Sequence, residues 1–441
     1  MSSKSFTKQT IFAGIAHMGS IICTLLSQIV VSRTFGPGGR GVYANAVALC
    51  GLLTVTIGMG HEMASAYLIA SRKRTVSEAA GNSLIGLLLN TALLSVPAFL
   101  ILYFRPAFVE ISSNRIILLV ILEVPLAWAS LYVYGLVRGM GRSDLSYVQY
   151  FVKSLAWLAG LVCFCWVFSI RRLEVVFITL VMASMVNLIV GLLLVKRVHG
   201  ALTFSFSRDS FKESVVYGIK HTLSRIANPM VFRPEMLIIP MLHVTESSLG
   251  LYAQGITVMD RFLALPTILT YVLVARVSAA PQKSVEMTAM LCRSVLFATF
   301  TLGLAIMVFA KPLMSFLFTS EFVPAVPMMW IMFPGIILRS VPRLLQSYFQ
   351  GTGRPGRVSI VFSMSITTMI VADVVFVWIM GIGGAAVGVL LACAVEFAGF
   401  VYLFKRSTNL GLADLCVIRL SDIVFIRNSL LNSISKNRRV A

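Results

Sequence analysis

Long apolar runs, separated by short charged or Gly/Pro-containing breaks, dominate this chain of 441 residues. A helix needs about 20 predominantly apolar residues to cross the hydrocarbon core of a bilayer. The continuity of the runs excludes a transmembrane β-barrel, whose strands alternate apolar and polar residues. We therefore predict an all-α polytopic membrane protein with about twelve transmembrane helices. The runs are residues 11–33, 42–69, 81–104, 115–137, 146–170, 174–195, 214–241, 248–275, 287–310, 325–349, 357–380 and 382–404.

The charge balance of the chain fits a membrane protein better than a nucleic-acid-binding protein. Lys and Arg total 37 against 17 Asp and Glu, which gives a formal net charge of +20. Such an excess can indicate a nucleic-acid partner, but 58% of the residues are hydrophobic and only 12% are charged. Basic residues gather in the cytoplasmic loops of membrane proteins, beside anionic lipid. We expect membrane lipids as partners, and no nucleic acid.

The distribution of the basic residues predicts the orientation of the helices. If the N-terminus is cytoplasmic, the cytoplasmic loops and tail hold 22 Lys and Arg, and the outer loops hold 7. The positive-inside rule therefore predicts that both termini are cytoplasmic. The tail, residues 405–441, mixes apolar and charged residues and ends in a basic stretch. We expect it to form an amphipathic segment on the inner membrane surface.

Two short motifs occur twice, half a chain apart. The stretch GVYANA at residues 41–46 returns as GLYAQG at 250–255, displaced by 209 positions. Gly139-Met-Gly141-Arg142 returns as Gly351-Thr-Gly353-Arg354, displaced by 212 positions. Both pairs stand at equivalent points of a plan of six helices followed by six. We expect the repeated glycines and tyrosines to be scaffold, because glycine lets helices approach closely and tyrosine anchors at the membrane interface.

The repeat predicts the organisation of the chain. Six helices return the chain to its starting side, so both halves have the same orientation and are related by an axis along the membrane normal. Such duplicated bundles commonly move substrates between their halves. The predicted parts are an N-terminal six-helix lobe over 1–195, a cytoplasmic linker over 196–213, a C-terminal six-helix lobe over 214–404 and a cytoplasmic tail over 405–441.

Three motifs carry a resemblance to a known family. They are Phe35-Gly-Pro-Gly-Gly-Arg-Gly-Val-Tyr43, the repeated Gly-x-Gly-Arg turn, and Leu412-Ala-Asp-Leu-Cys-Val-Ile-Arg-Leu-Ser-Asp422. With the twelve predicted helices, the chain resembles the Wzx-type O-antigen and polysaccharide flippases. These belong to the superfamily of the multidrug and toxic compound extruders and the lipid II flippases. Lipid II flippases usually carry fourteen helices, two more than we predict here.

The resemblance implies a V-shaped bundle of two six-helix lobes around a central cavity, as in the multidrug extruders. It implies a bacterial inner-membrane protein that moves an oligosaccharide on undecaprenyl pyrophosphate from the cytoplasmic to the periplasmic leaflet, for lipopolysaccharide or another surface polysaccharide. A proton or sodium gradient is the expected driving force, and a polysaccharide polymerase is an expected partner.

Basic residues inside the apolar runs are candidate substrate ligands. Burying a charge in hydrocarbon is costly, so a charged residue within a transmembrane helix is usually retained for function. In run 214–241, His221, Arg225 and Arg233 share one helix face, flanked by Lys220. Arginine binds pyrophosphate and carboxylate oxygens in bidentate fashion, so this face favours an anionic substrate. The repeat does not preserve this charge, since Ala16 is the equivalent of Arg225. Weaker candidates are Arg339, Lys153 and Arg261.

These basic residues also have a structural interpretation. Arg233 can pair with a carboxylate of a neighbouring helix, and Lys220 can extend to the cytoplasmic surface. The acidic residues inside the runs are candidates for cation coupling, since burial raises a carboxyl pKa toward physiological pH. Each can equally serve as a structural partner for an arginine. The coupling candidates are Asp373, Glu123, Asp260 and Glu62, with Glu235 and Glu396 also inside runs.

The sequence offers no motif for covalent chemistry. It contains no His-x-x-x-His, no Gly-x-Ser-x-Gly and no phosphate-binding or nucleotide-binding loop, so we expect neither an enzyme nor a pump driven by ATP. The seven cysteines lie in apolar runs or in the tail without metal-ligand spacing, so we expect no metal and no cofactor. Two alternatives remain open: a multidrug cation antiporter of the same superfamily and, less favoured, a membrane polysaccharide polymerase.

The predicted orientation can be tested with topology reporters fused after His243 and Ser320. Both positions lie in loops that the positive-inside rule assigns to the periplasm. A periplasm-dependent reporter such as alkaline phosphatase should be active at both positions, whereas a cytoplasmic readout at either one contradicts the orientation.

Overall fold

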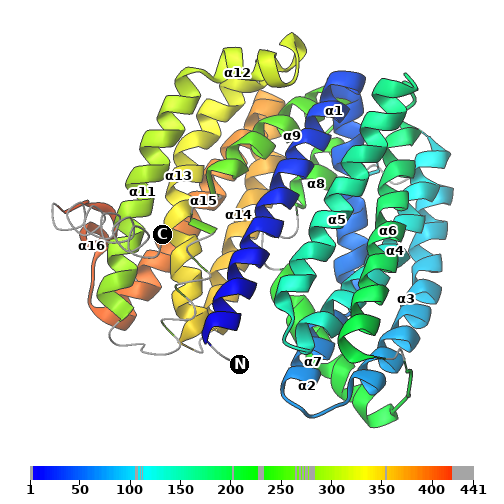
Figure 1. The fold of residues 1–441 in the computed structure, drawn as a ribbon. Coiled ribbons are helices and arrows are strands. Elements are labelled where there is room, and N and C mark those ends of the chain that lie inside the picture. The colour runs from blue at the N-terminus through cyan, green and yellow to red at the C-terminus, as the bar shows by residue number, and fades with distance from the viewer. Residues whose placement is uncertain are drawn as a thin grey trace, which may run out of the picture. The chain divides into compact units, whose positions relative to one another are not determined.

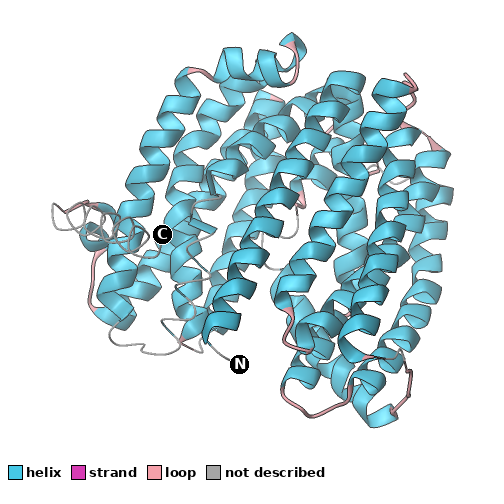
Figure 2. Cartoon of the chain, viewed as in Figure 1, coloured by secondary structure: helices cyan, strands magenta, loops and turns pink. Residues whose placement is uncertain are grey.

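The described part of the chain consists of helices, turns and loops. The structure, a computed structural model, describes residues 3–104, 108–109, 111, 113–200, 203–226, 233–263, 266–267, 270, 273, 277, 284–352 and 355–419, without the side chains of residues 3–11, 220–221, 223–226, 284 and 355. Figures 1 and 2 show the helices, and no strand occurs in these ranges.

The first half of the chain contributes α1 (Ser3–Ile57), α2 (His61–Ala70), α3 (Val76–Phe104), α4 (Asn114–Gly139), α5 (Ser143–Leu161), the π-helix η1 (Val162–Val167), α6 (Glu174–His199) and α7 (Arg208–Ile226). The second half contributes α8 (Glu235–Met241), α9 (Glu246–Asp260), η2 (Arg261–Leu263), α11 (Ser284–Val308), α12 (Ala310–Leu317), η3 (Ser320–Ala325), α13 (Val326–Gly351), α14 (Pro355–Met380), α15 (Ile382–Thr408) and α16 (Leu412–Cys416).

Nine helical stretches among the described residues are long and apolar enough to cross a bilayer. The first, Phe12–Ile57, has 46 residues and covers run 11–33 and most of run 42–69. At 1.5 Å per residue it would be roughly 70 Å long, more than twice the hydrocarbon thickness. Gly36, with φ 64° and ψ −168°, breaks the helical geometry directly before Pro37. This stretch is therefore two transmembrane segments joined at a kink, and α2 completes the second.

The other eight stretches correspond to the four predicted runs between 81 and 195 and the four between 287 and 404. Runs 214–241 and 248–275 contain α7, α8, α9 and η2, none of which meets the same criteria of length and hydropathy. Residues 227–232 and most of 264–283 lie outside the described part of the chain. The all-α polytopic class is confirmed, and the number of twelve stays a prediction.

The chain divides by its internal contacts into two compact units. Unit 1 comprises Met1–Ala253 and Ser315–Val323, and unit 2 comprises Gln254–Met314 and Pro324–Ala441. In unit 1, α1 packs on α5 and α4 packs on α6. In unit 2, α15 packs on both α13 and α14. The lobe boundaries expected from the sequence stay a prediction.

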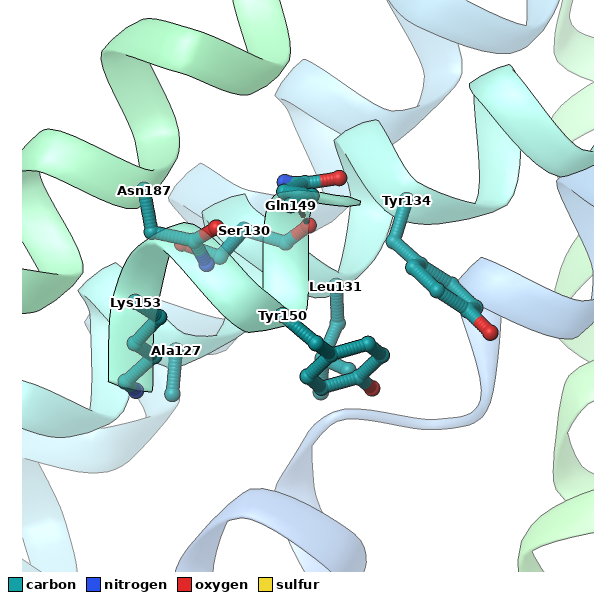
Figure 3. A pocket seen from close by; sticks show the side chains of 8 residues that line it. All are labelled: Ala127, Ser130, Leu131, Tyr134, Gln149, Tyr150, Lys153 and Asn187. Atoms are coloured by element: carbon teal, nitrogen blue, oxygen red, sulfur yellow. Dashed lines mark hydrogen bonds between the residues drawn. The ribbon is translucent and has the colours of Figure 1, made fainter. Parts of the chain in front are cut away.

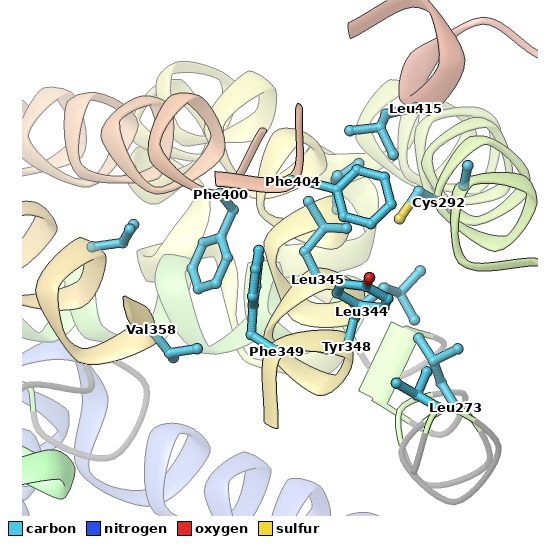
Figure 4. Packing of buried hydrophobic residues seen from close by; sticks show 14 of the residues in the cluster. Leu273, Cys292, Leu344, Leu345, Tyr348, Phe349, Val358, Phe400, Phe404 and Leu415 are labelled. Atoms are coloured by element: carbon cyan, nitrogen blue, oxygen red, sulfur yellow. The ribbon is translucent and has the colours of Figure 1, made fainter. Parts of the chain in front are cut away.

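An aromatic cluster forms the core of unit 2 (Figure 4). Phe349 from α13 and Phe400 from α15 are fully buried in it, together with Leu415 from α16. The short α16 thus closes one end of the cluster. The guanidinium of Arg293 on α11 donates a hydrogen bond to the backbone oxygen of Asp414 at 2.6 Å, which fixes α16 against α11. Residues 420–441 of the tail lie outside the described part.

Large apolar side chains cover the outside of the helices. Leu88 on α3 and Ile189 on α6 are 63% and 58% exposed, and Trp378 on α14 is 86% exposed. Soluble proteins rarely expose apolar surface on this scale, whereas lipid-facing helices carry it. This pattern supports a bilayer as the surrounding medium.

The two copies of the repeated Gly-x-Tyr-Ala motif contact each other in unit 1. A Cβ atom added to Gly41 on α1 would lie 1.9 Å from the backbone oxygen of Glu246. A Cβ atom added to Gly250 on α9 would lie 1.8 Å from the backbone oxygen of Pro37 and 2.9 Å from the backbone nitrogen of Gly41. The two helices therefore cross with their backbones in direct contact, which only glycine permits at both positions. Gly41 and Gly250 thus serve the packing of the two helices, whereas the role of the other repeated glycines stays a prediction.

Gly41→Ala and Gly250→Ala should each destabilise the protein, because the added methyl group meets rigid backbone rather than a movable side chain. Overpacking of this kind costs about 1–3 kcal/mol. We expect a lower thermal unfolding midpoint for both variants, measured in detergent by size-exclusion after heating. Gly14→Ala, whose new Cβ atom meets nothing within 4 Å, is the matched control and should match or exceed the wild type. Unchanged midpoints for all three variants would contradict the contact.

Candidate functional site

Three helices of unit 1 bring a lysine, a carboxylate and a hydroxyl together. The Nζ atom of Lys153 on α5 lies 3.0 Å from Oε1 of Glu123 on α4. The hydroxyl of Ser184 on α6 donates to the same Oε1 at 2.6 Å. The Glu123 side chain is 4% exposed and the Lys153 side chain 26%. Two predicted site residues from different classes, one basic and one acidic, thus form a partly open ion pair.

The second oxygen of the Glu123 carboxylate differs from the first. Oε2 is buried and has no hydrogen-bond partner among the described residues. A buried oxygen that accepts no hydrogen bond is costly while the carboxylate is charged, since hydrogen bonds stabilise the charged form.

Lys153 lines two cavities. One, of about 290 Å³, is lined by Tyr43 and Cys50 of α1, by Glu123 and by Phe177 of α6. The other, of about 210 Å³, is drawn in Figure 3. Lys153 and Ala127 line both cavities. Lys153 therefore lines two cavities, and its partner Glu123 lines only one of them.

The second cavity carries uncharged polar groups that the search for charged residues missed. Gln149 on α5 and Asn187 on α6 are 2% and 5% exposed and both line the cavity (Figure 3). The Gln149 amide nitrogen donates to the backbone oxygen of Ser130 on α4 at 3.3 Å. Hydrogen-bonding groups within a lipid-embedded bundle are costly unless they find partners. The signal was present in the sequence, because Gln149, Ser184 and Asn187 interrupt otherwise apolar runs.

Among the basic residues of run 214–241, the structure describes the side chain of Arg233 but not those of Lys220 and Arg225. The side chains of Lys220 and Arg225, at the end of α7, lie outside the described residues, so their role as substrate ligands stays a prediction. Arg233 is described, and its Nη1 lies 3.2 Å from Oε1 of Glu235. This partner is two residues along the chain. The Arg233 side chain is 31% exposed and that of Glu235 is 3% exposed.

A second, fully buried ion pair lies in unit 2. Arg339 on α13 donates from Nε and Nη2 to the two carboxylate oxygens of Glu396 on α15, at 2.8 and 2.7 Å. Ser365 on α14 donates to Oε1 of the same carboxylate at 3.2 Å. The side chains of Arg339 and Glu396 are 8% and 1% exposed. Asp260 is close enough to interact with Arg339 electrostatically. This closed, bidentate arrangement stabilises the packing of three helices and leaves the Arg339 guanidinium little room for a ligand.

The remaining candidates are buried at separate places. Asp373 on α14 is completely buried, and a Cβ atom on Gly388 of α15 would lie 2.0 Å from its Oδ1. Glu62, 6% exposed, lies in the first turn of α2. Arg261 follows Asp260 at the end of α9 and is partly buried. Within the described residues, no group of three or more His, Cys, Asp and Glu side chains could hold a metal ion.

A comparison with family models shows the family of the chain. A model of the polysaccharide biosynthesis protein family matches residues 6–259, more than half of the chain. The chain belongs to this family. The resemblance to the polysaccharide flippases drawn from the sequence is thereby confirmed. No curated protein matches the sequence.

Solved structures of transporters share the fold of this family member. The lipid II flippase MurJ, in an inward closed conformation, matches with a TM-score of 0.70 at 14% sequence identity, covering 96% of this chain and 93% of that one. An inward-facing multidrug resistance MATE transporter of the MOP superfamily matches with a TM-score of 0.68 at 17% identity, covering 90% and 98%. A MOP superfamily transporter from Pyrococcus furiosus gives 0.57 at 15% identity, covering 91% and 96%. The fold is that of MOP transporters.

Breaking the Arg339–Glu396 pair should destabilise unit 2, because one uncompensated charge remains buried. Removing one partner of a buried pair typically costs about 3–5 kcal/mol, whereas replacing both by apolar residues is often neutral. We expect Arg339→Leu and Glu396→Leu to lower the yield of monodisperse protein and the thermal midpoint, and the double variant to recover most of the loss. If the double variant is as unstable as the sum of the two single variants, the pair is not the reason for the effect.

Proposed function

We propose that the chain is a flippase that moves an oligosaccharide linked to undecaprenyl pyrophosphate from the cytoplasmic to the periplasmic leaflet of a bacterial inner membrane. Transport would follow alternating access, and the product would enter O-antigen or related surface polysaccharide synthesis. The proposal is supported by membership of the polysaccharide biosynthesis family and by the MurJ-like fold. The observation that carries it here is Lys153, a basic residue that lines two cavities within a largely apolar bundle.

Lys153 is proposed to bind an anionic group of the substrate, a phosphate or an acidic sugar. An ammonium group inside a low-dielectric bundle attracts an anion strongly, provided that its counter-charge is displaced or neutralised. Glu123 holds this ammonium in the substrate-free arrangement at 3.0 Å. The substrate anion would thus replace Glu123 as the partner of Lys153. Arg225, Arg233 and Lys220 are proposed as further contacts, with Arg339 and Arg261 as weaker ones.

Glu123 is proposed as the cation-coupling residue, with a proton as the ion. A proton on the unpaired Oε2 would neutralise the carboxylate and release Lys153 for the substrate. Binding linkage is reciprocal, so the proton and the anionic substrate would favour each other's binding. The membrane potential, negative inside, favours outward movement of each negative charge by about 2.3 kcal/mol per 100 mV. In this scheme the driving force is therefore the membrane potential acting on a pyrophosphate lipid with more than one negative charge, and the bound proton moves outward with the lipid, opposite to an inward proton gradient. Asp373, Asp260 and Glu62 remain further candidates.

Lys153→Ala should abolish transport, because it removes the cation that lines both cavities. It also leaves the buried Glu123 without its counter-charge, so the thermal midpoint of the variant is measured alongside transport to separate loss of function from loss of folding. The test is mass spectrometry of lipid extracts from a strain that lacks this protein and is complemented with each variant. We expect the undecaprenyl pyrophosphate oligosaccharide to accumulate at least tenfold with Lys153→Ala, and less with Lys153→Arg. Lys311→Ala, at an exposed lysine on α12, should behave as the wild type.

Three outcomes separate the possibilities in this experiment. Accumulation with the empty strain and with Lys153→Ala supports both the flippase function and the role of Lys153. Accumulation with the empty strain alone supports the flippase function and rejects Lys153 as a substrate ligand. If no such lipid accumulates in the empty strain, the flippase proposal fails, and drug susceptibility of the same strain would test the multidrug alternative.

Glu123→Gln should alter the pH dependence of transport rather than abolish it. The amide cannot ionise, so Lys153 stays released at every pH, whereas in the wild type protonation of Glu123 is required. We expect wild-type transport in reconstituted vesicles to fall as the pH rises, and the profile of the Glu123→Gln variant to be flatter. Glu286→Gln, at an exposed carboxylate on α11, is the matched control. Equal slopes for Glu123→Gln and wild type would contradict a proton on Glu123.

A further inference from the structure

A third cavity, separate from the Lys153 site, opens between the beginnings of α4 and α6. Its volume is about 560 Å³, and it is bounded at one end by Arg115 and Arg172. Along its length it is lined by apolar side chains, among them Leu118 and Leu122 of α4 and Ile178 of α6. We call this cavity the α4–α6 groove. Neither arginine belongs to the site described above.

The apolar part of the α4–α6 groove faces the surroundings of the bundle. Leu118, Leu122 and Ile178 are 53%, 50% and 42% exposed. All three belong to helices that are long and apolar enough to span the membrane. In a bilayer these side chains contact lipid tails, so the groove is accessible laterally to an acyl chain.

The end of the α4–α6 groove that carries Arg115 and Arg172, here called its head, is electropositive. Arg115 and Arg172 are exposed, and within the described residues neither guanidinium forms an ion pair or a hydrogen bond. α4 and α6 also begin here, at Asn114 and Glu174, and run in the same direction. The unpaired N–H groups and the positive dipole ends of both helices therefore add to the two arginines.

Glu174 is the acidic residue among the lining residues of the groove. It lies in the first turn of α6, where the helix dipole stabilises a carboxylate, and it forms no ion pair with either arginine within the described residues. Two guanidinium groups and two helix N-termini against one carboxylate leave a net positive head above an apolar channel. This combination is complementary to an amphiphile with an anionic headgroup, and arginine pairs bind phosphate oxygens in bidentate fashion.

We propose that the α4–α6 groove binds an anionic phospholipid of the surrounding bilayer. The phosphate would lie between Arg115 and Arg172, and an acyl chain would lie along Leu118, Leu122 and Ile178. Under the predicted orientation this end of the helices faces the periplasm, so the lipid would come from the outer leaflet. Leu119 lines both this groove and the cavity that contains Glu123, so a bound lipid would pack against the helix that carries the proposed coupling residue.

The test measures lipid binding to the purified full-length protein by native mass spectrometry, with phosphatidylglycerol and phosphatidylcholine as probes. We expect phosphatidylglycerol to bind at least tenfold more tightly than phosphatidylcholine, and Arg115→Gln/Arg172→Gln to remove this preference. Arg171→Gln is the matched control, because Arg171 is an exposed arginine directly before Arg172 that does not line the groove. Its preference for phosphatidylglycerol should remain.

A second variant tests the apolar part with the charges intact. Ile178→Trp should fill the acyl-chain channel and weaken phosphatidylglycerol binding severalfold, at an exposed position where a larger side chain does not disturb the core. Thermal midpoints confirm that all variants fold.

Three results would overturn the proposal. The first is equal binding of both phospholipids to the wild type. The second is an equal loss with Arg171→Gln, which would indicate a general surface charge. The third is binding of undecaprenyl phosphate in place of phosphatidylglycerol, which would assign the groove to the carrier lipid. None of these results depends on whether the protein is a flippase.

Discussion

Hydrocarbon offers an ionised side chain neither water nor counter-ions, so each charge inside this bundle has to find its partner on the protein. Among the described residues, pairs of this kind include Lys153 with Glu123, Arg233 with Glu235, and Arg339 with Glu396. Two of them tie one helix to another, and their positions determine which helix faces can pack together.

The two interhelical pairs, Arg339 with Glu396 and Lys153 with Glu123, differ in how completely the carboxylate oxygens are hydrogen-bonded. Arg339 and Glu396 satisfy each other through two parallel hydrogen bonds, and Ser365 adds a third. Lys153 and Glu123 meet through one oxygen, with the other oxygen unpaired and with cavities beside the ammonium group. A completed pair has little to gain from a ligand, whereas an incomplete pair can exchange partners. We therefore weight Lys153 above Arg339 as a substrate ligand, although the sequence favoured neither.

The sequence predicted the fold class because apolar runs of bilayer length leave the chain few alternatives. It did not predict the interruptions within the runs. Run 42–69 is broken at residues 58–60, between α1 and α2, where the sequence contains Gly58 and Gly60. Run 146–170 changes from an α-helix into a π-helix at Val162. The partners of the charged residues were also beyond reach, because Glu123 and Lys153 are 30 positions apart and meet only through the packing of α4 on α5 and α6. The periodicity of a sequence shows which residues share one face of a helix, but it does not show which helix faces pack against each other.

The backbone contact between Gly41 and Gly250 limits how the two halves of the chain can diverge. At most interfaces a larger residue on one side can be accommodated by a smaller one on the other. Here both sides already carry the smallest residue, and each meets main-chain atoms, so neither copy of the motif has a substitution that the other can offset. Elsewhere the halves differ freely in charge, as Ala16 and Arg225 do at equivalent positions. The two halves of the sequence can thus differ in charge while the crossing point keeps glycine on both sides, and the smallest side chains of the chain become the least replaceable.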